Sequence, residues 1–510
     1  MSLGLLPSPR SLAIQPGRVV WESPLRIVVP EDWQWVVERF AQDLMSAVDW
    51  RVEIVGQNET PDIEIAVDDA FADEGFELRV DDCTRISART AAGVSYALAT
   101  LRQLAPLEVW GTVPRQAVSL ELPRVEIKDG PAFAWRGVHL DVARHFWSVA
   151  DVCRFIDLIA VHRLNKLHLH LNDDQGWRVA IPSWPRLTQV GSRRRSSPLG
   201  HEDDGVDDDR VHEGFYSADD LEDIRQHADS RCVQVIPEID LPGHAQAAIA
   251  AYPQLGNTDK QLEVWTRWGI SEHVLNPGRE ALAFAGDVVE YVAGLFPGSP
   301  VHIGGDECLV DEWRQSPVAQ EVMSENGFVD ERSLQGLFTN RMSAVLRPEG
   351  HEAVAWDEVL DADVPEGTLI MAWRRPSKGV EAAERGFDVV MAPMNFTYFD
   401  WRNSDAASEP VSVAPVPFVT PWEKVYRFSV YPPGLREGLR HHVRGAQAQL
   451  WTEYISTRDH LDYMAFPRLC AFSEVVWGTH GALKDFRERL EIHLGRLGSL
   501  GVSYRPLDPS

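Results

Sequence analysis

The stretch Lys166-Leu-His-Leu-His-Leu-Asn-Asp-Asp174 decides the fold, because it is a short apolar run that ends directly in carboxylates. Seven further short runs rich in Val, Ile, Leu and Ala lie on either side of it, and amphipathic segments separate them. Such runs are typical of parallel strands that are buried on both faces. The eight runs cover residues 137–142, 166–171, 233–239, 301–304, 353–356, 369–373, 389–392 and 446–451.

Helices are predicted between these strands. Ser148 and Ser217 stand three residues before Asp151 and Asp220, which is the pattern of a helix N-cap, and they predict helices over 149–161 and 218–228. Apolar periodicity predicts further helices over 280–296, 333–346 and 460–476. Alternating strands and helices predict an α/β fold, a (β/α)8 TIM barrel with long insertions, whose active site lies at the carboxyl ends of the strands.

The first 130 residues differ from the remainder in the order and length of their predicted strands and helices. Short strands are predicted over 25–29, 51–55 and 63–67, and helices over 32–48 and 91–104, which indicates a small α+β domain. The proline-punctuated stretch 106–131 is interpreted as the passage into the barrel. A chain of 510 residues exceeds one ordinary core, so we expect an α+β domain over 1–130 and the barrel domain over 131–510.

Composition excludes several classes of partner. The formal net charge of -28 opposes binding to nucleic acid or to an anionic membrane surface. No run of about eighteen apolar residues predicts a membrane span. Five scattered cysteines without a CxxC spacing indicate reduced thiols. Residues 1–10 lack the pattern of a secretion signal, so a cytoplasmic location is expected, although a leader removed upstream stays possible.

Polar and aromatic residues follow each predicted strand, where the active site of a barrel is expected. They are Asp141, Arg144, His145, Asp173, Asp174, Trp177, Glu238, Asp240, His244, Asp306, Glu307, Trp356, Asp357, Glu358, Trp373, Tyr398, Asp400, Trp451 and Glu453. Indoles stack on the apolar face of a sugar ring, and acids with arginine bind its hydroxyls. The set therefore favours sugar chemistry, although each tryptophan taken alone is as typical of core packing.

Asp306 and Glu307 are adjacent, which restricts the mechanism. The two carboxylates of an ordinary glycosidase flank the bond at about 5 Å or about 6.5 to 9.5 Å, and neighbours on one strand end point in divergent directions. One acid is therefore expected to protonate the leaving oxygen while the other orients part of the substrate. The alternative for this Gly-Gly-Asp-Glu turn is a helix N-cap with solvated carboxylates.

Two histidine motifs allow other interpretations. His168 and His170 share one strand face, the spacing of a metal pair in some barrel hydrolases, but no third ligand stands at the expected place. Histidines that are satisfied by neighbours inside the barrel are the favoured interpretation. His244 follows a strand end, where an aspartate would hold it as a charged partner, but its Pro-Gly-His turn is also compatible with a structural role.

At these residues the chain resembles glycoside hydrolase family 20, the β-N-acetylhexosaminidases. The resemblance runs in order along the whole chain, and residues 1–130 resemble the non-catalytic domain that precedes the barrel in this family. It rests on Trp135-Arg136-Gly137, Asp141-Val-Ala-Arg-His-Phe146, His168-Leu-His-Leu-Asn-Asp-Asp-Gln-Gly-Trp-Arg178, Pro237-Glu-Ile-Asp-Leu-Pro-Gly-His244, His302-Ile-Gly-Gly-Asp-Glu307, Ala355-Trp-Asp-Glu358, Met371-Ala-Trp373, Tyr398-Phe-Asp400 and Gly445-Ala-Gln-Ala-Gln-Leu-Trp-Thr-Glu453.

The resemblance implies a retaining exo-enzyme that removes terminal non-reducing N-acetylhexosamine residues by substrate-assisted catalysis, without cofactor or metal. The substrate's acetamide oxygen would attack the anomeric carbon and form an oxazolinium intermediate. Glu307 would be the general acid/base, Asp306 would orient the acetamide N–H, and Tyr398 would hold its oxygen. Asp173 and His244 would support Glu307, with Asp174 left open as the alternative partner of His244.

The resemblance also implies a set of substrate-binding residues. Trp356, Trp373 and Trp451 would wall the acetamide and the sugar ring, with Trp422 as an additional wall. Arg136 and Glu453 would bind the 3- and 4-hydroxyls, and Asp400 the 4- or 6-hydroxyl. The rivals are a metal-dependent barrel hydrolase and a catalytically silent carbohydrate-binding protein. The natural substrate, the choice between GlcNAc and GalNAc and the oligomeric state are not indicated.

Overall fold

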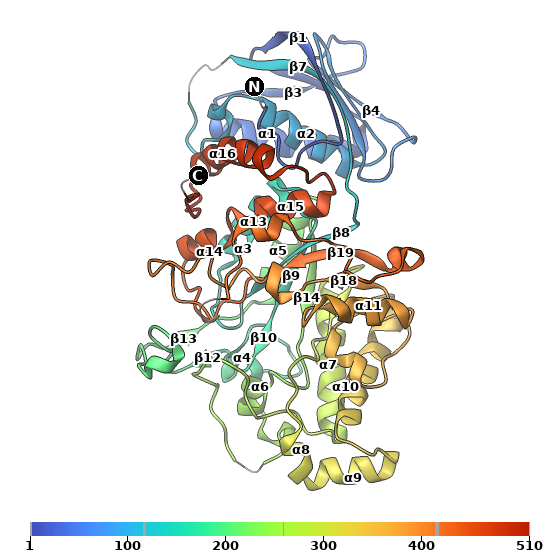
Figure 1. Ribbon diagram of the computed structural model, residues 1–510, viewed down its shortest axis with the longest axis vertical. Helices are drawn as coiled ribbons and strands as arrows, with labels where there is room; N and C mark the ends of the chain where they lie inside the picture. Colours follow the sequence, from blue (N-terminus) through green and yellow to red (C-terminus); the bar gives the residue numbers. More distant parts are fainter. Residues whose placement is uncertain (1–2, 116–118, 259, 414–417, 509–510) are drawn as a thin grey trace.

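The computed structural model describes residues 3–115, 119–258, 260–413 and 418–508. Within them, eight parallel strands close into a barrel in the order β14-β15-β16-β17-β18-β19-β8-β9, which confirms the predicted fold (Figure 1). The strands are β8 (Trp135–Asp141), β9 (Lys166–His170), β14 (Gln234–Glu238), β15 (Val301–His302), β16 (Ala353–Trp356), β17 (Leu369–Ala372), β18 (Val389–Met391) and β19 (Val443–Ala448). The last strand ends earlier than predicted, so that Trp451 and Glu453 follow it.

Helices surround this barrel. The principal ones are α3 (Val149–Val161), α5 (Ala218–Asp229), α7 (Arg279–Leu295), α10 (Arg332–Leu346) and α11 (Pro376–Glu384). The caps are as predicted, because the side chains of Ser148 and Ser217 accept from the backbone N–H groups of Asp151 and Asp220.

The helix predicted over 460–476 was wrong as a single helix. It is divided into α14 (Arg458–Ala465) and α15 (Arg468–Trp477), with Pro467 between them. Phe466 is extended, with φ -112° and ψ 137°, because a residue before proline is disfavoured in the helical region.

The N-terminal domain is a seven-stranded sheet in the order β1-β7-β5-β6-β4-β2-β3, and it carries α1 (Gln34–Ala47) and α2 (Ala91–Leu104). Its strands are β1 (Ser11–Trp21), β2 (Leu25–Val28), β3 (Val52–Ile54), β4 (Ile63–Val67), β5 (Phe76–Val80), β6 (Thr84–Ala88) and β7 (Leu120–Asp129). The interpretation of 106–131 as a passage between domains was wrong over β7, which pairs with both β1 and β5.

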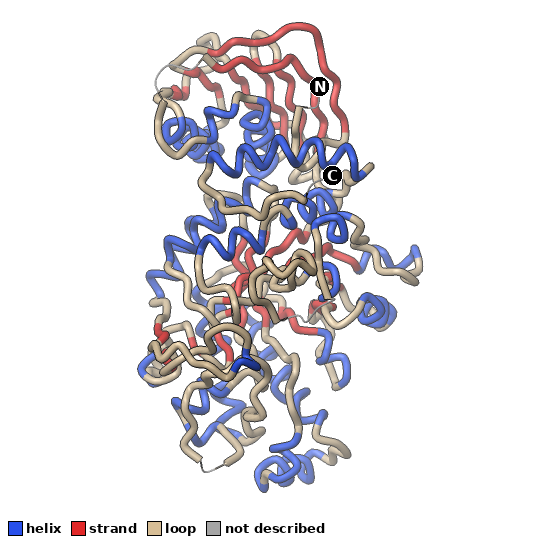
Figure 2. The backbone as a smooth tube through the Cα atoms, turned by 60° about the vertical axis from the view of Figure 1, so that its left-hand side comes forward, coloured by secondary structure: helices blue, strands red, loops and turns tan. Residues whose placement is uncertain are grey.

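The C-terminal helix α16 (Leu483–Ser499) returns to the N-terminal domain, and Figures 1 and 2 show it lying below that domain. Arg496 on this helix donates to the backbone oxygen of Gln103 at the end of α2 (2.8 Å). The C-terminal helix therefore contacts the N-terminal domain at its junction with the barrel. Among the described residues, no helix is both long enough and apolar enough to cross a membrane.

Candidate active site

The acids at 306 and 307 follow β15 on a turn that requires glycine. Gly304 has φ +64°, and a Cβ atom there would lie 1.7 Å from Oδ1 of Asp240. Glu307 itself has φ 46°, and His244, which follows β14, has φ 48°. Left-handed backbone at a residue other than glycine costs about 1–3 kcal/mol, and such strain gathers at functional sites.

Glu307 is in contact with a buried histidine. Nε2 of His244 lies 3.5 Å from Oε2 of Glu307, whose side chain is 33% exposed. Burial alone would lower the pKa of His244, but the Asp173 carboxylate more than offsets it, so the pKa lies well above its usual value. His244 therefore presents a positive charge to the one carboxylate of this group that is partly open to solvent.

Asp173 is the nearer of the two aspartates that contact His244. Oδ1 of Asp173 lies 3.2 Å from Nδ1 of His244, and its Oδ2 pairs with Nη2 of Arg144 at 2.7 Å. Oδ2 of Asp174 lies 3.6 Å from the same nitrogen of His244, and the oxygens of Asp174 also accept from the backbone N–H groups of Gln246 (3.0 Å) and Ser271 (3.1 Å). The shorter distance favours Asp173 between the two partners that the sequence left open.

Asp306 forms a second, separate pair with Asp240. Burial, reinforced by the negative charge of Asp240, raises the pKa of Asp306 well above its usual value, and burial raises the pKa of Asp240 to about 7. Oδ1 of Asp306 and Oδ2 of Asp240 each lack a hydrogen-bond partner among the described residues. One proton shared between the two carboxyl groups accounts for both observations.

Aromatic rings form a wall beside these acids. Trp373 stacks on Tyr398 with ring centroids 5.9 Å apart, and its indole N–H donates to Glu358 (2.9 Å). Trp451 also lies near Tyr398, with ring centroids 6.4 Å apart. Trp356 is fully buried, 6.1 Å from Trp451, and therefore forms the base of this wall.

Three ionisable groups, Asp400, Glu453 and Arg144, lie close together beside this wall. Burial and the nearby charge of Glu453 raise the pKa of Asp400 well above its usual value. Burial also raises the pKa of Glu453, against the opposite effect of Arg144. The guanidinium of Arg144 lies 5.0 Å from the ring centroid of Trp451. Arg144 follows β8 at its carboxyl end, where the rule for barrels places ligand contacts, and it was not among the predicted binding residues.

Arg136 was wrongly predicted to bind sugar hydroxyls. It is the second residue of β8, at the amino end of the strand, and its side chain is 0% exposed. Its guanidinium pairs with Glu74 of the N-terminal domain (2.7 and 2.9 Å) and donates to the hydroxyl of Tyr96 (2.9 Å). Arg136 therefore joins the two domains on the face of the barrel opposite the acids.

Replacing Arg136 by Met tests this assignment. Removing one partner of a buried ion pair is expected to lower the free energy of unfolding by about 3–5 kcal/mol, with KM of the folded enzyme unchanged. Arg144→Met, which lies beyond the carboxyl end of the same strand, is the matched variant and should raise KM. Urea unfolding and steady-state kinetics on both variants check the pair, and a raised KM in Arg136→Met would contradict the assignment.

Trp422 was also wrongly predicted as a wall of the site. It begins the short helix α13 (Trp422–Tyr426), is 3% exposed, and packs on Phe486 of α16 with ring centroids 5.5 Å apart. The indole thus belongs to the core beneath the C-terminal helix.

His168 and His170 lie inside the barrel and are fully buried. Both contact the carboxylate of Glu238, and Nε2 of His170 also lies 3.0 Å from Oδ2 of Asp173. They are satisfied by neighbours, which was the favoured interpretation. His302 also contacts Glu238, through Nδ1 at 2.8 Å.

Two family models match this chain. "Glycosyl hydrolase family 20, catalytic domain" matches residues 133–480, and "Glycosyl hydrolase family 20, domain 2" matches residues 2–130. The chain is 38% identical to a β-hexosaminidase of Porphyromonas gingivalis over 94% of this chain and 61% of that protein. It is 33% identical to a β-hexosaminidase of Vibrio furnissii over 92% of this chain and 76% of that protein.

Solved structures agree with these matches. The exo β-N-acetylglucosaminidase from Vibrio harveyi, in complex with N-acetylglucosamine, has a TM-score of 0.89 and 30% identity, covering 99% of this chain and 78% of that one. The N-acetyl-β-hexosaminidase of Streptomyces plicatus, in complex with Thio-NAglucal, has a TM-score of 0.86 and 29% identity, covering 99% and 97%.

Proposed function

The chain belongs to glycoside hydrolase family 20, a family of β-N-acetylhexosaminidases, and we propose that it removes terminal non-reducing β-linked N-acetylhexosamine residues from a carbohydrate, with retention of configuration. The observation that carries the proposal is the division of the adjacent acids into two environments. Glu307 is partly open and faces a charged histidine, whereas Asp306 is buried in a proton-sharing pair with Asp240.

Glu307 is assigned the exchange of a proton with the glycosidic oxygen. Its neighbour His244 is held by Asp173, which Arg144 fixes in turn. In the first step Glu307 donates its proton to the leaving oxygen, and in the second it removes one from the attacking water. The buried chain from Arg144 to His244 keeps the acid in place during this change of charge.

The nucleophile is assigned to the substrate. Asp306 accepts a hydrogen bond from the acetamide N–H, which raises the electron density on the acetamide oxygen as that oxygen attacks the anomeric carbon. Burial and the nearby Asp306 raise the pKa of Tyr398 well above its usual value, so its hydroxyl stays protonated and can donate to the acetamide oxygen. Trp373 and Trp451 flank Tyr398 and exclude water from the oxazolinium ring.

The position of Arg144 supports a different hydroxyl-binding set. Arg144 replaces Arg136 as the cation that meets sugar hydroxyls, and Asp400 and Glu453 serve as acceptors beside it. A buried acceptor without its partner is costly, so a site of this kind discriminates strongly against a sugar that lacks the matching hydroxyl.

Hydrolysis of p-nitrophenyl N-acetyl-β-glucosaminide, compared with p-nitrophenyl β-glucoside, tests the proposed function. Activity on the first and none on the second is expected, because the glucoside lacks the acetamide nucleophile. Equal activity on both would contradict the assignment, and inactivity on both would favour a binding protein. Activity that is lost on chelation and restored by zinc would favour the metal-dependent alternative.

Asp240→Asn should change the pH dependence. An amide at 240 can still accept from the N–H of Gly305 and can donate to Asp306, so Asp306 no longer shares a proton with a second carboxyl group. The pKa of Asp306 should then fall. Activity that requires an ionised Asp306 rises with pH through that pKa, so the acidic limb of the kcat/KM profile should move to lower pH. An acidic limb that stays at the same pH would show that the pair of Asp306 and Asp240 does not control the pH dependence.

A further inference from the structure

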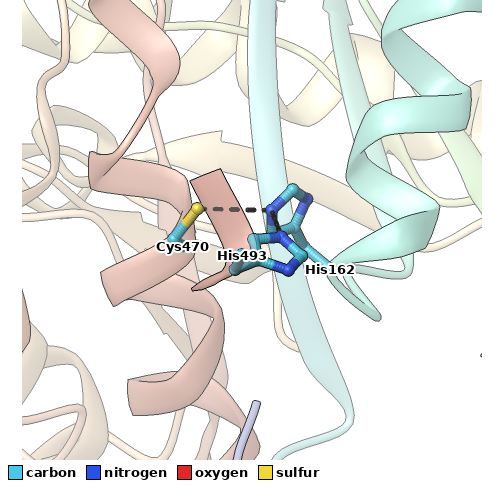
Figure 3. Close-up of side chains that lie close together, drawn as sticks. All are labelled: His162, Cys470 and His493. Carbon is cyan, nitrogen blue, oxygen red and sulfur yellow. Dashed lines mark hydrogen bonds between the residues drawn. The ribbon is translucent and has the colours of Figure 1, made fainter. Parts of the chain in front are cut away.

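His162, Cys470 and His493 meet in the interior between three helices (Figure 3). His162 is the C-cap residue of α3, Cys470 lies on α15, and His493 lies on α16. All three are 0% exposed. Nε2 of His162 lies 3.4 Å from Sγ of Cys470 and 3.1 Å from Nε2 of His493. None of these residues has a part in the proposed reaction.

These separations resemble the edges of a metal coordination shell. Zinc binds imidazole nitrogen at about 2.0–2.1 Å and thiolate sulfur at about 2.3 Å in tetrahedral geometry. Two such nitrogens lie about 3.3 Å apart, and a nitrogen and a sulfur about 3.6 Å apart, from the same bond lengths. The observed contacts of 3.1 and 3.4 Å are each about 0.2 Å shorter than those edges, and the ligand atoms of Cys470 and His493 lie within 4.8 Å of one another.

One acceptor serves two possible donors in this cluster. Nδ1 of His162 lies 2.7 Å from the backbone oxygen of Leu158, so Nδ1 carries the proton and Nε2 has a single lone pair. The thiol of Cys470 and the N–H of His493 both lie within reach of that one lone pair. A cation at the centre would instead take one lone pair from each residue. The bond from His162 to Leu158 is also the outer contact that ligating histidines normally make.

The charge state is compatible with a soft divalent ion. Burial lowers the pKa of His162 to about 4, so its imidazole is neutral and available as a ligand. Burial raises the pKa of the Cys470 thiol, and a bound metal ion would have to deprotonate it, as coordination does. The guanidinium of Arg496 is a positive charge that would repel a bound cation, since its Nη1 lies 3.4 Å from Nδ1 of His493. It also donates to the backbone oxygens of Gly4 and Gln103.

We propose that His162, Cys470 and His493 form a binding site for one zinc ion that fastens the C-terminal helix to the barrel. His162 stands just before β9 begins, at the amino end of the barrel strands, whereas Glu307 follows the carboxyl end of β15. The site is therefore structural. Through α16 it also holds the contact between Arg496 and the N-terminal domain.

Metal analysis of the purified protein tests the proposal. About one zinc ion per chain is expected in the wild type, and Cys470→Ser and His493→Gln should lose it. Protein produced in cobalt-supplemented medium should show a thiolate-to-cobalt charge-transfer band that Cys470→Ser abolishes. Cys153→Ser, which removes a half-buried thiol from α3 outside the cluster, is the matched control and should keep both metal and band.

Stability provides the second measurement. Chelation should lower the Tm of the wild type by several degrees and leave that of Cys470→Ser unchanged, because only the native cluster binds the ion. At low temperature kcat/KM should be the same with and without chelator. Wild-type protein that contains no zinc and no cobalt band would overturn the proposal. Metal retained in Cys470→Ser would overturn it too, since the ion would then lie elsewhere.

Discussion

Glu307→Gln is expected to lower kcat/KM by about 10²- to 10⁴-fold for N-acetylhexosaminides with poor leaving groups, the range that general acid catalysis contributes. An amide cannot give a proton to the departing oxygen, yet it has the size of the carboxyl group and keeps the contact distance to His244. The loss should fall mainly on kcat, because the interaction with the leaving oxygen develops in the transition state.

The leaving group supplies the internal control for this variant. A dinitrophenyl glycoside needs little protonation on departure, so Glu307→Gln should cleave it with a much smaller loss in the first step. Asp174→Asn is the matched control for the change from carboxylate to amide, because Asp174 is a buried carboxylate that accepts from backbone N–H groups. Equal losses for good and poor leaving groups would show that Glu307 is not the acid.

Asp306→Asn is expected to have the second large effect and to lower kcat by about 10²- to 10³-fold. This is the loss that follows the removal of one group that stabilises charge in the transition state. The asparagine retains the shape of the side chain but not the negative charge that offsets the developing oxazolinium. The defect should grow as the acetamide of the substrate is made less nucleophilic by fluorine substitution.

A series of N-fluoroacetyl substrates measures that dependence for both enzymes. The wild type should lose rate steadily with each fluorine, because the acetamide oxygen is the attacking atom. Asp240→Asn, which keeps Asp306 ionised, is the control and should follow the wild-type slope. A rate that is independent of fluorine substitution would contradict any role of Asp306 in guiding the acetamide.

The barrel and the position of its site were predictable because both depend on local pattern. Short apolar runs such as 166–171 identify buried parallel strands, and strand direction alone places the acids at one face. The same rule separates Arg144 from Arg136. Arg136 lies near the amino end of β8, whereas Arg144 follows its carboxyl end. The motif resemblance led to the wrong prediction that Arg136 binds sugar. The direction of the strand alone would have placed Arg136 at the opposite face of the barrel.

Other features depend on distant partners and left no local signal. β1 is largely exposed along its length, so it lacks the alternation that reveals a strand. Trp422 packs on Phe486, and His162 meets His493, across long intervals of sequence. The choice between Asp173 and Asp174 depended on which carboxylate the backbone of Gln246 and Ser271 had already taken.

The central claim is that the substrate's acetamide, and no enzyme carboxylate, forms the covalent bond to the anomeric carbon. Inhibition by the thiazoline analogue of N-acetylglucosamine, a stable mimic of the oxazolinium, tests it most directly. The account predicts competitive inhibition with a Ki far below KM, weakened strongly in Asp306→Asn. Weak inhibition of the wild type, or mass-spectrometric detection of a sugar bonded to Asp306 or Glu307, would contradict it.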